Sequence, residues 1–198
     1  PIALLALKDP STAVSSPAAQ YFVDNGIAED ASSYWEMAKE PNTWQVQLAL
    51  YSAANKHLPT AFVESRKYLN WEIQRRFESA ADPYEKAAAL KALAAFPWNY
   101  KYIRDVGYAI DIPVVKVASV EALASIASMP NFAQFFKGAK MVKKELSGFF
   151  VEAIQNGDVG MTAVAAGVLR DTSLGFKGMI DSLAFLENAL LKLNKPQD

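Results

Sequence analysis

Apolar residues recur at helical spacing along almost the whole chain. Within residues 60–79, one face of the expected helix carries Phe62, Leu69, Ile73 and Phe77. The basic residues of this segment lie largely elsewhere, which is typical of an amphipathic helix with one packed and one solvated face. Alternating strand patterns joined by Asn-Gly turns are nearly absent, and glycines and prolines fall between the periodic segments. The pattern predicts an all-α fold.

Five segments share one arrangement of small and apolar residues. In DIPVVKVASVEALASIASMP, residues 111–130, Val115 is taken as position zero, so that the small residues Ala118 and Ser119 stand at +3 and +4. An apolar pair follows at +7 and +8. The same frame begins at Val14, Val46, Glu85 and Met161, at intervals of 30 to 46 residues. Recurrence at such intervals is typical of stacked helix pairs with loops of unequal length.

Small residues at +3 and +4 allow a neighbouring helix to approach closely, so these five segments are expected to be the inner helices of the pairs. The alanines expected to be buried against adjacent repeats are Ala49, Ala88, Ala89, Ala118 and Ala165. An Asp or Asn stands three to five residues before each zero position and is expected to cap the helix or close a turn. These residues are Asp9, Asn42, Asp82, Asp111 and Asp158.

Longer and more aromatic segments lie between the inner helices and are expected to supply the partner helix of each pair. They cover residues 29–40, 60–79, 97–110 and 131–155, and a last segment from about Leu174 to Leu193 would close the stack. The sequence therefore predicts about ten helices, arranged as antiparallel pairs.

Three of these stretches, ALLALKDPSTAVSSPAAQYF, DPYEKAAALKALAAF and DIPVVKVASVEALASIAS, resemble HEAT repeats. The resemblance implies an α-α superhelix, a HEAT-like solenoid of about four to five stacked helix pairs that forms one domain over residues 1–198. The chain departs from the HEAT pattern at several positions. The usual Arg at +1 is replaced by Ser15, Gln47, Lys86, Lys116 or Thr162, Pro17 lies near the start of the first inner helix, and Glu85 replaces an apolar zero residue.

The composition limits the classes of function. Lys plus Arg number 20 and Asp plus Glu number 21, so no net field attracts the chain to nucleic acid or to an anionic membrane. The absence of cysteine excludes disulfides, thiol catalysis and thiolate metal sites. No apolar run approaches the roughly 20 residues of a membrane-spanning helix. Because the sequence starts with Pro1, it is expected to be a piece of a longer protein.

Residues suited to catalysis are scarce. The one histidine, His57, lies near the end of an inner helix, where it is expected to interact with the helix dipole. No Ser lies in a G-x-S-x-G elbow, and no Glu-x-x-His pattern supports a di-iron site. The stretch GDVG, residues 157–160, lacks the Lys and the spacing of a phosphate loop. The sequence therefore predicts no catalytic residue, cofactor or metal.

Two groups of residues are candidates for binding a partner. The first comprises positions +1 and +6 of the inner helices, which are expected on the concave surface: Gln47, Lys86, Lys91, Lys116 and Glu121. The second lies in FPWNYKYIRDVGY, residues 96–108, and comprises Trp98, Tyr100, Tyr102 and Arg104. Interleaved aromatic and basic residues pack between helices, form protein-binding hot spots or stack nucleic-acid bases.

The leading hypothesis is a non-enzymatic scaffold arm of a larger protein that binds a protein or peptide. The aromatic-rich repeats also resemble the HEAT arms of cyclophilin-type peptidyl-prolyl isomerases of bacterial envelopes, which implies a noncatalytic arm in the cell envelope or periplasm. HEAT-like DNA glycosylases provide another alternative, because they use Trp, Asp and Arg on a concave face, as Trp98, Asp105 and Arg104 would allow. The sequence pI of about 6.0 argues against nucleic acid.

Overall fold

The computed structural model describes residues 2–26, 30–40, 43–57, 63–171 and 174–176, and the secondary structure within these ranges is entirely helical. The predicted all-α fold is confirmed. The chain divides into two compact units, Pro1–Ala95 and Phe96–Asp198, called unit 1 and unit 2 below.

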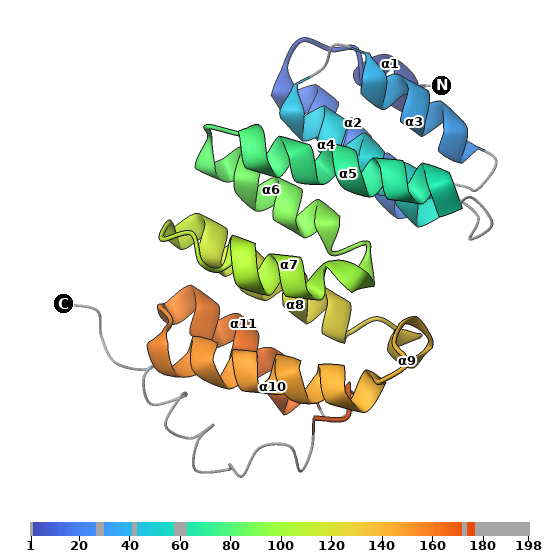
Figure 1. Cartoon of the computed structure of the whole chain (residues 1–198). Helices are drawn as coiled ribbons and strands as arrows, with labels where there is room; N and C mark the ends of the chain where they lie inside the picture. The colour runs from blue at the N-terminus through green and yellow to red at the C-terminus, as the bar shows by residue number, and fades with distance from the viewer. Residues whose placement is uncertain (1, 27–29, 41–42, 58–62, 172–173, 177–198) are drawn as a thin grey trace. The chain divides into compact units, whose positions relative to one another are not determined.

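Unit 1 consists of helices in two layers (Figure 1). Its described helices are α1 (Ile2–Ala6), α2 (Thr12–Asn25), α3 (Ala31–Lys39), α4 (Trp44–His57), α5 (Val63–Ser79) and α6 (Pro83–Leu93). Helix α4 contacts both α2 and α6, so the three predicted inner helices pack in chain order. The partner helix α1 packs on α2, α3 packs on α4, and α5 packs on α4 and α6.

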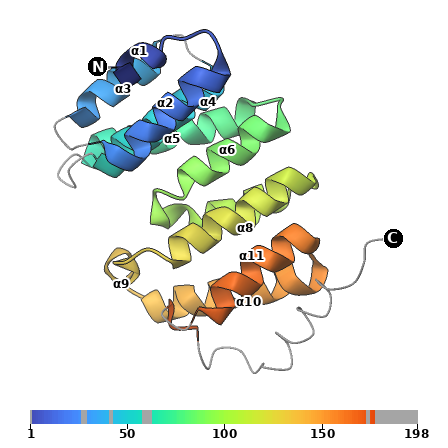
Figure 2. The same ribbon diagram turned by 180° about the vertical axis from the view of Figure 1, so that it is seen from behind.

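Unit 2 repeats this arrangement with a more irregular first partner segment. It contains the 3-10 turn η2 (Pro97–Asn99), α7 (Tyr100–Tyr102), the π-helical turn η3 (Ile103–Gly107), α8 (Pro113–Ala127), α9 (Phe132–Phe135), α10 (Ala139–Asn156) and α11 (Val159–Arg170). The inner helices α8 and α11 pack against each other, and α10 contacts both of them (Figure 2). Helix α8 also packs on η3.

The predicted repeat frame coincides with the inner helices. All five zero positions lie two residues after the first residue of their helix: Val14 in α2, Val46 in α4, Glu85 in α6, Val115 in α8 and Met161 in α11. Position +4 is buried in every one of these helices, and +7 and +8 are buried in α4, α6, α8 and α11. These positions form the seam along which each inner helix packs.

The burial of the predicted alanines is confirmed in part. Ala89, Ala118 and Ala165 are buried, but Ala49 and Ala88 are only half-buried. Both exceptions stand at +3, whereas Leu50 and Ala89 at +4 are fully buried. The packed faces of α4 and α6 therefore centre nearer to +4, and +3 lies at their edge.

Only some of the predicted capping residues cap a helix. Asp82 accepts a hydrogen bond from the backbone N–H of Tyr84 (2.9 Å), and Asp158 accepts one from Met161 (2.9 Å). Asp9 accepts from Ser11 N–H in the turn before α2, whereas Asp111 lies before the N-cap of α8 and bonds to a lysine instead.

Two predicted partner helices are interrupted. The segment 97–110 begins at Pro97 and forms short 3-10, α and π turns, and 131–155 is divided into α9 and α10 by residues 136–138. Asn42 and Phe62 lie outside the described residues, as does all of the predicted closing segment beyond residue 176.

Candidate functional site

The three predicted binding residues at +1 connect the starts of α4, α6 and α8 to the residues that precede these helices. Gln47 Nε2 donates to the backbone carbonyl of Glu40, the C-cap residue of α3 (3.4 Å). Lys86 Nζ donates to the carbonyl of Phe77 in the last turn of α5 (2.7 Å) and lies 5.0 Å from the Phe77 ring centre. These side chains satisfy carbonyl groups that a helix end leaves without a helical partner.

Lys116 is engaged in a similar way in unit 2. Its Nζ lies 2.8 Å from Asp111 Oδ1 and 5.9 Å from the centre of the Tyr108 ring, at the end of η3. The hydrogen bond between the two charged groups lowers the pKa of Asp111 and raises the pKa of Lys116. The ammonium is therefore already paired in the structure.

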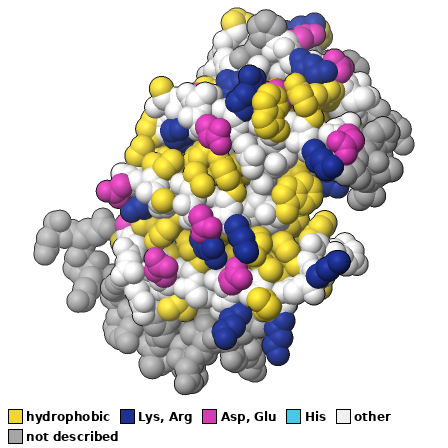
Figure 3. Space-filling model, in the orientation of Figure 1, with side chains coloured by type: hydrophobic (Ala, Val, Ile, Leu, Met, Phe, Trp, Pro, Cys, Tyr) yellow, Lys and Arg dark blue, Asp and Glu magenta, His cyan; other side chains and the backbone are white. Residues whose placement is uncertain are grey.

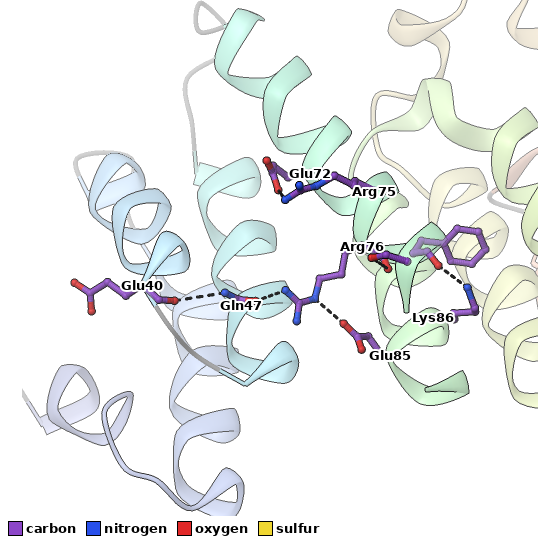
Figure 4. Close-up of polar contacts among 9 residues, drawn as sticks. Glu40, Gln47, Glu72, Arg75, Arg76, Glu85 and Lys86 are labelled. Atoms are coloured by element: carbon purple, nitrogen blue, oxygen red, sulfur yellow. Dashed lines mark hydrogen bonds and ion pairs between the residues drawn. The ribbon is translucent and has the colours of Figure 1, made fainter. Parts of the chain in front are cut away.

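Arg76 of α5 joins the three last helices of unit 1 (Figure 4). Its guanidinium donates to Gln47 Oε1 of α4 and lies 2.7 Å from Glu85 Oε1 of α6. Both charged side chains are half-buried, so the contacts are better shielded from solvent than a fully exposed surface pair. This network accounts for Glu85, whose carboxylate stands where the repeat frame expects an apolar residue.

The two remaining residues of the predicted concave row differ in exposure. Lys91 in α6 is exposed, and Glu121 in α8 is half-buried. The structure places Gln47, Lys86 and Lys91 in unit 1, whereas Lys116 and Glu121 belong to unit 2.

The predicted aromatic region, residues 96–108, is mainly packed. Tyr100 is buried, its ring stands edge-on to Phe136 at 5.4 Å, and its hydroxyl donates to Glu145 Oε2 (3.2 Å). Burial, followed by the charge of Glu145, raises the pKa of Tyr100. Tyr102 is half-buried, so Trp98, with 47% of its surface exposed, is the most open residue of the predicted group.

Arg104 is held by two carboxylates. Its Nε and Nη2 bind the two oxygens of Asp105 (2.6 and 3.1 Å), and its Nη1 lies 3.4 Å from Glu145. The hydrogen bond to Arg104 lowers the pKa of Asp105 and raises that of the arginine. The structure thus brings Tyr100 and Arg104 together around Glu145, where both donate to the same carboxylate oxygen.

A second aromatic group lies on α3, α4 and α5 of unit 1 and was not predicted. It comprises Trp35 of α3, Tyr51 of α4, and Tyr68 and Trp71 of α5, and is called the α3–α5 aromatic cluster. The ring centres of Trp35 and Tyr68 are 5.1 Å apart at 87°, and those of Tyr68 and Trp71 are 5.6 Å apart. Tyr51 is buried beneath Trp35 at 5.8 Å, but Tyr68 and Trp71 remain 47% and 51% exposed.

Two ion pairs lie beside the tryptophan rings at the rim of this cluster. Lys39 Nζ lies 4.6 Å from the Trp35 ring and 2.8 Å from Glu36, and Arg75 lies 5.2 Å from the Trp71 ring and 3.0 Å from Glu72. A hydrogen bond to Glu72 raises the pKa of Tyr68. The exposed rings are therefore fixed by neighbours on several sides.

The sequence contains a partial signal for this cluster. Tyr68 and Trp71 are three residues apart, so they lie on one face of a helix. Trp35 is far from them in sequence, and its place beside Tyr68 depends on the packing of α3 near α5.

His57, the last residue of α4, contacts residues of α2 and α3. Its Nε2 lies 3.2 Å from the carbonyl oxygen of Val23, and its ring stands edge-on to Tyr34 at 6.3 Å. Within the described ranges, no group of three or more His, Asp or Glu residues is placed to hold a metal ion. No helix in the same ranges is both long and apolar enough to cross a membrane.

Comparison of the chain with models of known protein families, with curated proteins and with solved structures finds no match.

Proposed function

We propose that the chain is a non-enzymatic, HEAT-like repeat domain that binds a protein or peptide as the scaffold arm of a larger protein. The coincidence of the repeat frame with all five inner helices supports the repeat architecture. Sequential packing of the inner helices within each unit supports it as well. In repeat proteins of this kind, the surfaces of successive helices form extended binding sites.

The α3–α5 aromatic cluster is the observation that carries the binding proposal. Tyr and Trp are the residues most enriched in interface hot spots, together with Arg. Single exposed hydrophobic residues are common on protein surfaces, but Trp35, Tyr68 and Trp71 form a continuous group of rings. Because ring contacts and rim ion pairs already restrict these side chains, a partner loses little conformational entropy in binding them.

The charges at the rim favour a protein partner over nucleic acid. Lys39 and Arg75 are the cations over the rings, and each is paired with a glutamate. A phosphate backbone would therefore meet neutralised cations and two nearby carboxylates. A peptide with apolar side chains can instead cover the rings while its polar groups contact the charged rim.

A peptide selection tests this function directly. Peptides selected from a random 12-residue display library on the immobilised chain are titrated in solution against purified variants. Trp71→Ala is expected to weaken binding about tenfold or more, as for a hot-spot residue. Tyr84→Ala is the matched control, because Tyr84 is an exposed aromatic residue outside the cluster, and it should change affinity less than about twofold.

Two results would contradict the proposal. If the selected peptides bind Trp71→Ala and the wild type with equal affinity, the cluster is not part of the peptide-binding site. Tight, salt-sensitive binding of a single-stranded oligonucleotide, with no peptide selected, would instead favour the nucleic-acid alternative.

A further inference from the structure

A group of lysines and exposed apolar side chains lies on α9 and the first half of α10. No Asp or Glu occurs between Glu121 and Glu145, although four lysines fall within this stretch. Three of them, Lys137, Lys140 and Lys144, are exposed, and with Phe135 and Met141 they form what we call the cationic–apolar patch. Lys and Arg side chains gather over this part of the molecule in the lower right of Figure 3.

The three lysines differ in their surroundings from the cations of the chain that form ion pairs. Lys39, Lys67 and Lys116 each pair with a carboxylate within 2.8 Å. Within the part of the chain that the structure describes, Lys137, Lys140 and Lys144 have no ion-pair partner. No carboxylate of the described residues neutralises their charges.

The stability of α10 does not explain these charges. The first turn of the helix contains Lys140 and no acidic residue. The amino-terminal end of a helix carries partial positive charge, so a lysine there is unfavourable. A local arrangement that opposes stability often has a functional reason.

The apolar members of the patch face outward. Phe132 and Val142 are buried and anchor α9 and α10 to unit 2, whereas Phe135 is 46% exposed and Met141 is 69% exposed. A side chain that is two-thirds exposed projects from the surface and does not line a recess. A folded protein partner would need a matching hollow for it, but a fluid lipid surface deforms around it.

We propose that the cationic–apolar patch docks unit 2 onto an anionic lipid surface. The lysines attract acidic headgroups, each strengthening binding about fivefold. Phe135 and Met141 enter the boundary between headgroups and acyl chains, as the apolar side chains of peripheral proteins do. A net charge of −1 does not prevent this, because screening limits each charge to about 10 Å and the nearby surface decides the attraction.

Vesicle sedimentation with the full chain tests the proposal. Vesicles of phosphatidylcholine alone are compared with vesicles containing 30% phosphatidylserine, at low and at high sodium chloride. The wild type is expected to bind the phosphatidylserine vesicles at low salt and to dissociate at high salt. The triple variant K137Q/K140Q/K144Q should lower the partition coefficient about a hundredfold.

Two further variants separate the contributions. K8Q/K56Q/K67Q removes the same charge from exposed lysines of unit 1 and should bind within about threefold of the wild type. F135S/M141S should lower the partition coefficient several-fold at low salt. The patch triple variant should melt no lower than the wild type, because it removes an unfavourable charge from the start of α10.

Several outcomes would overturn the assignment to lipid. These are no vesicle binding by the wild type, equal binding to both kinds of vesicle, and equal losses in the patch and control triple variants. Binding to polyglutamate that depends on the patch, without binding to vesicles, would assign the patch to an acidic protein segment instead.

Discussion

At the scale of single residues, the side chains at +1 show that the spacing of residues in the sequence must be combined with the direction in which a helical side chain points. The frame correctly located Gln47, Lys86 and Lys116 near the start of inner helices, but spacing alone could not indicate where their polar ends lie. In a helix the Cα–Cβ bonds tilt toward the amino terminus, so long side chains in the first turns extend toward the preceding loop. There they meet carbonyl groups or a carboxylate of the preceding element.

The pairing of Asp111 with Lys116 predicts a selective change in a carboxyl pKa. Lys116→Ala should raise the pKa of Asp111 toward its ordinary value of 3.8 and leave Asp105 unchanged, whereas Arg104→Ala should do the reverse. Because folding lowers both pKa values, each carboxylate contributes stability above its unfolded pKa, and this is lost as the pH falls through the lowered value, below about pH 4. NMR titration of the carboxyl carbons measures both groups. Movement of both after either substitution would contradict separate pairs.

The different burial of the alanines in the repeat frame predicts different tolerance to added volume. Ala118→Leu should lower the free energy of unfolding by about 1–3 kcal/mol, because Ala118 lies on the packed seam of α8. Ala88→Leu should cost less than about 1 kcal/mol, since Ala88 lies at the edge of the packed face of α6. Urea unfolding of both variants gives the comparison. Equal losses would mean that +3 is equivalent in the two helices.

At the scale of helices, the regular elements were predictable and the irregular ones were not. The inner helices have a strong apolar period, and their starts are marked by short polar residues or by Pro83 and Pro113 in the first turn. The segment 97–110 also has many aromatic residues, which suggested one helix. Its actual path of short turns depends on the burial of Asn99, Ile103 and Gly107, which tertiary packing determines.

The Arg76 network predicts that two adjacent arginines of α5 contribute unequally to stability. Arg76→Ala should lower the free energy of unfolding by about 1–2 kcal/mol, because it leaves the half-buried Glu85 carboxylate without its cation and Gln47 Oε1 without its donor. Arg75→Ala should cost about 0.5 kcal/mol, since Arg75 is largely exposed where it pairs with Glu72. Chemical denaturation of the two variants tests this order. A larger loss for Arg75→Ala would show that α4, α5 and α6 are not joined mainly through Arg76.

At the scale of the whole molecule, the sequence indicated the residue types of a candidate binding surface better than the helices on which that surface lies. The densest aromatic and basic stretch of the sequence contains Trp98, Tyr100, Tyr102 and Arg104. In the structure Tyr100 is buried, and the polar groups of Tyr100 and Arg104 are bonded to Glu145. The α3–α5 aromatic cluster takes its members from three helices, so local sequence could reveal only the Tyr68 and Trp71 pair. Net charge concealed the cationic–apolar patch, because acidic residues elsewhere in the chain balance its lysines.

The two proposed surfaces belong to different units, and this predicts that their ligands respond to different substitutions. Trp71→Ala should weaken peptide binding about tenfold or more and leave the partition onto phosphatidylserine vesicles within about twofold of the wild type. K137Q/K140Q/K144Q should show the opposite pattern, because the aromatic rings are held by Glu36, Lys39, Glu72 and Arg75, which this variant retains. Peptide titration and vesicle sedimentation on the same protein preparations measure both effects. Loss of both activities in either variant would mean that one surface serves both ligands, since substitutions at independent sites act separately.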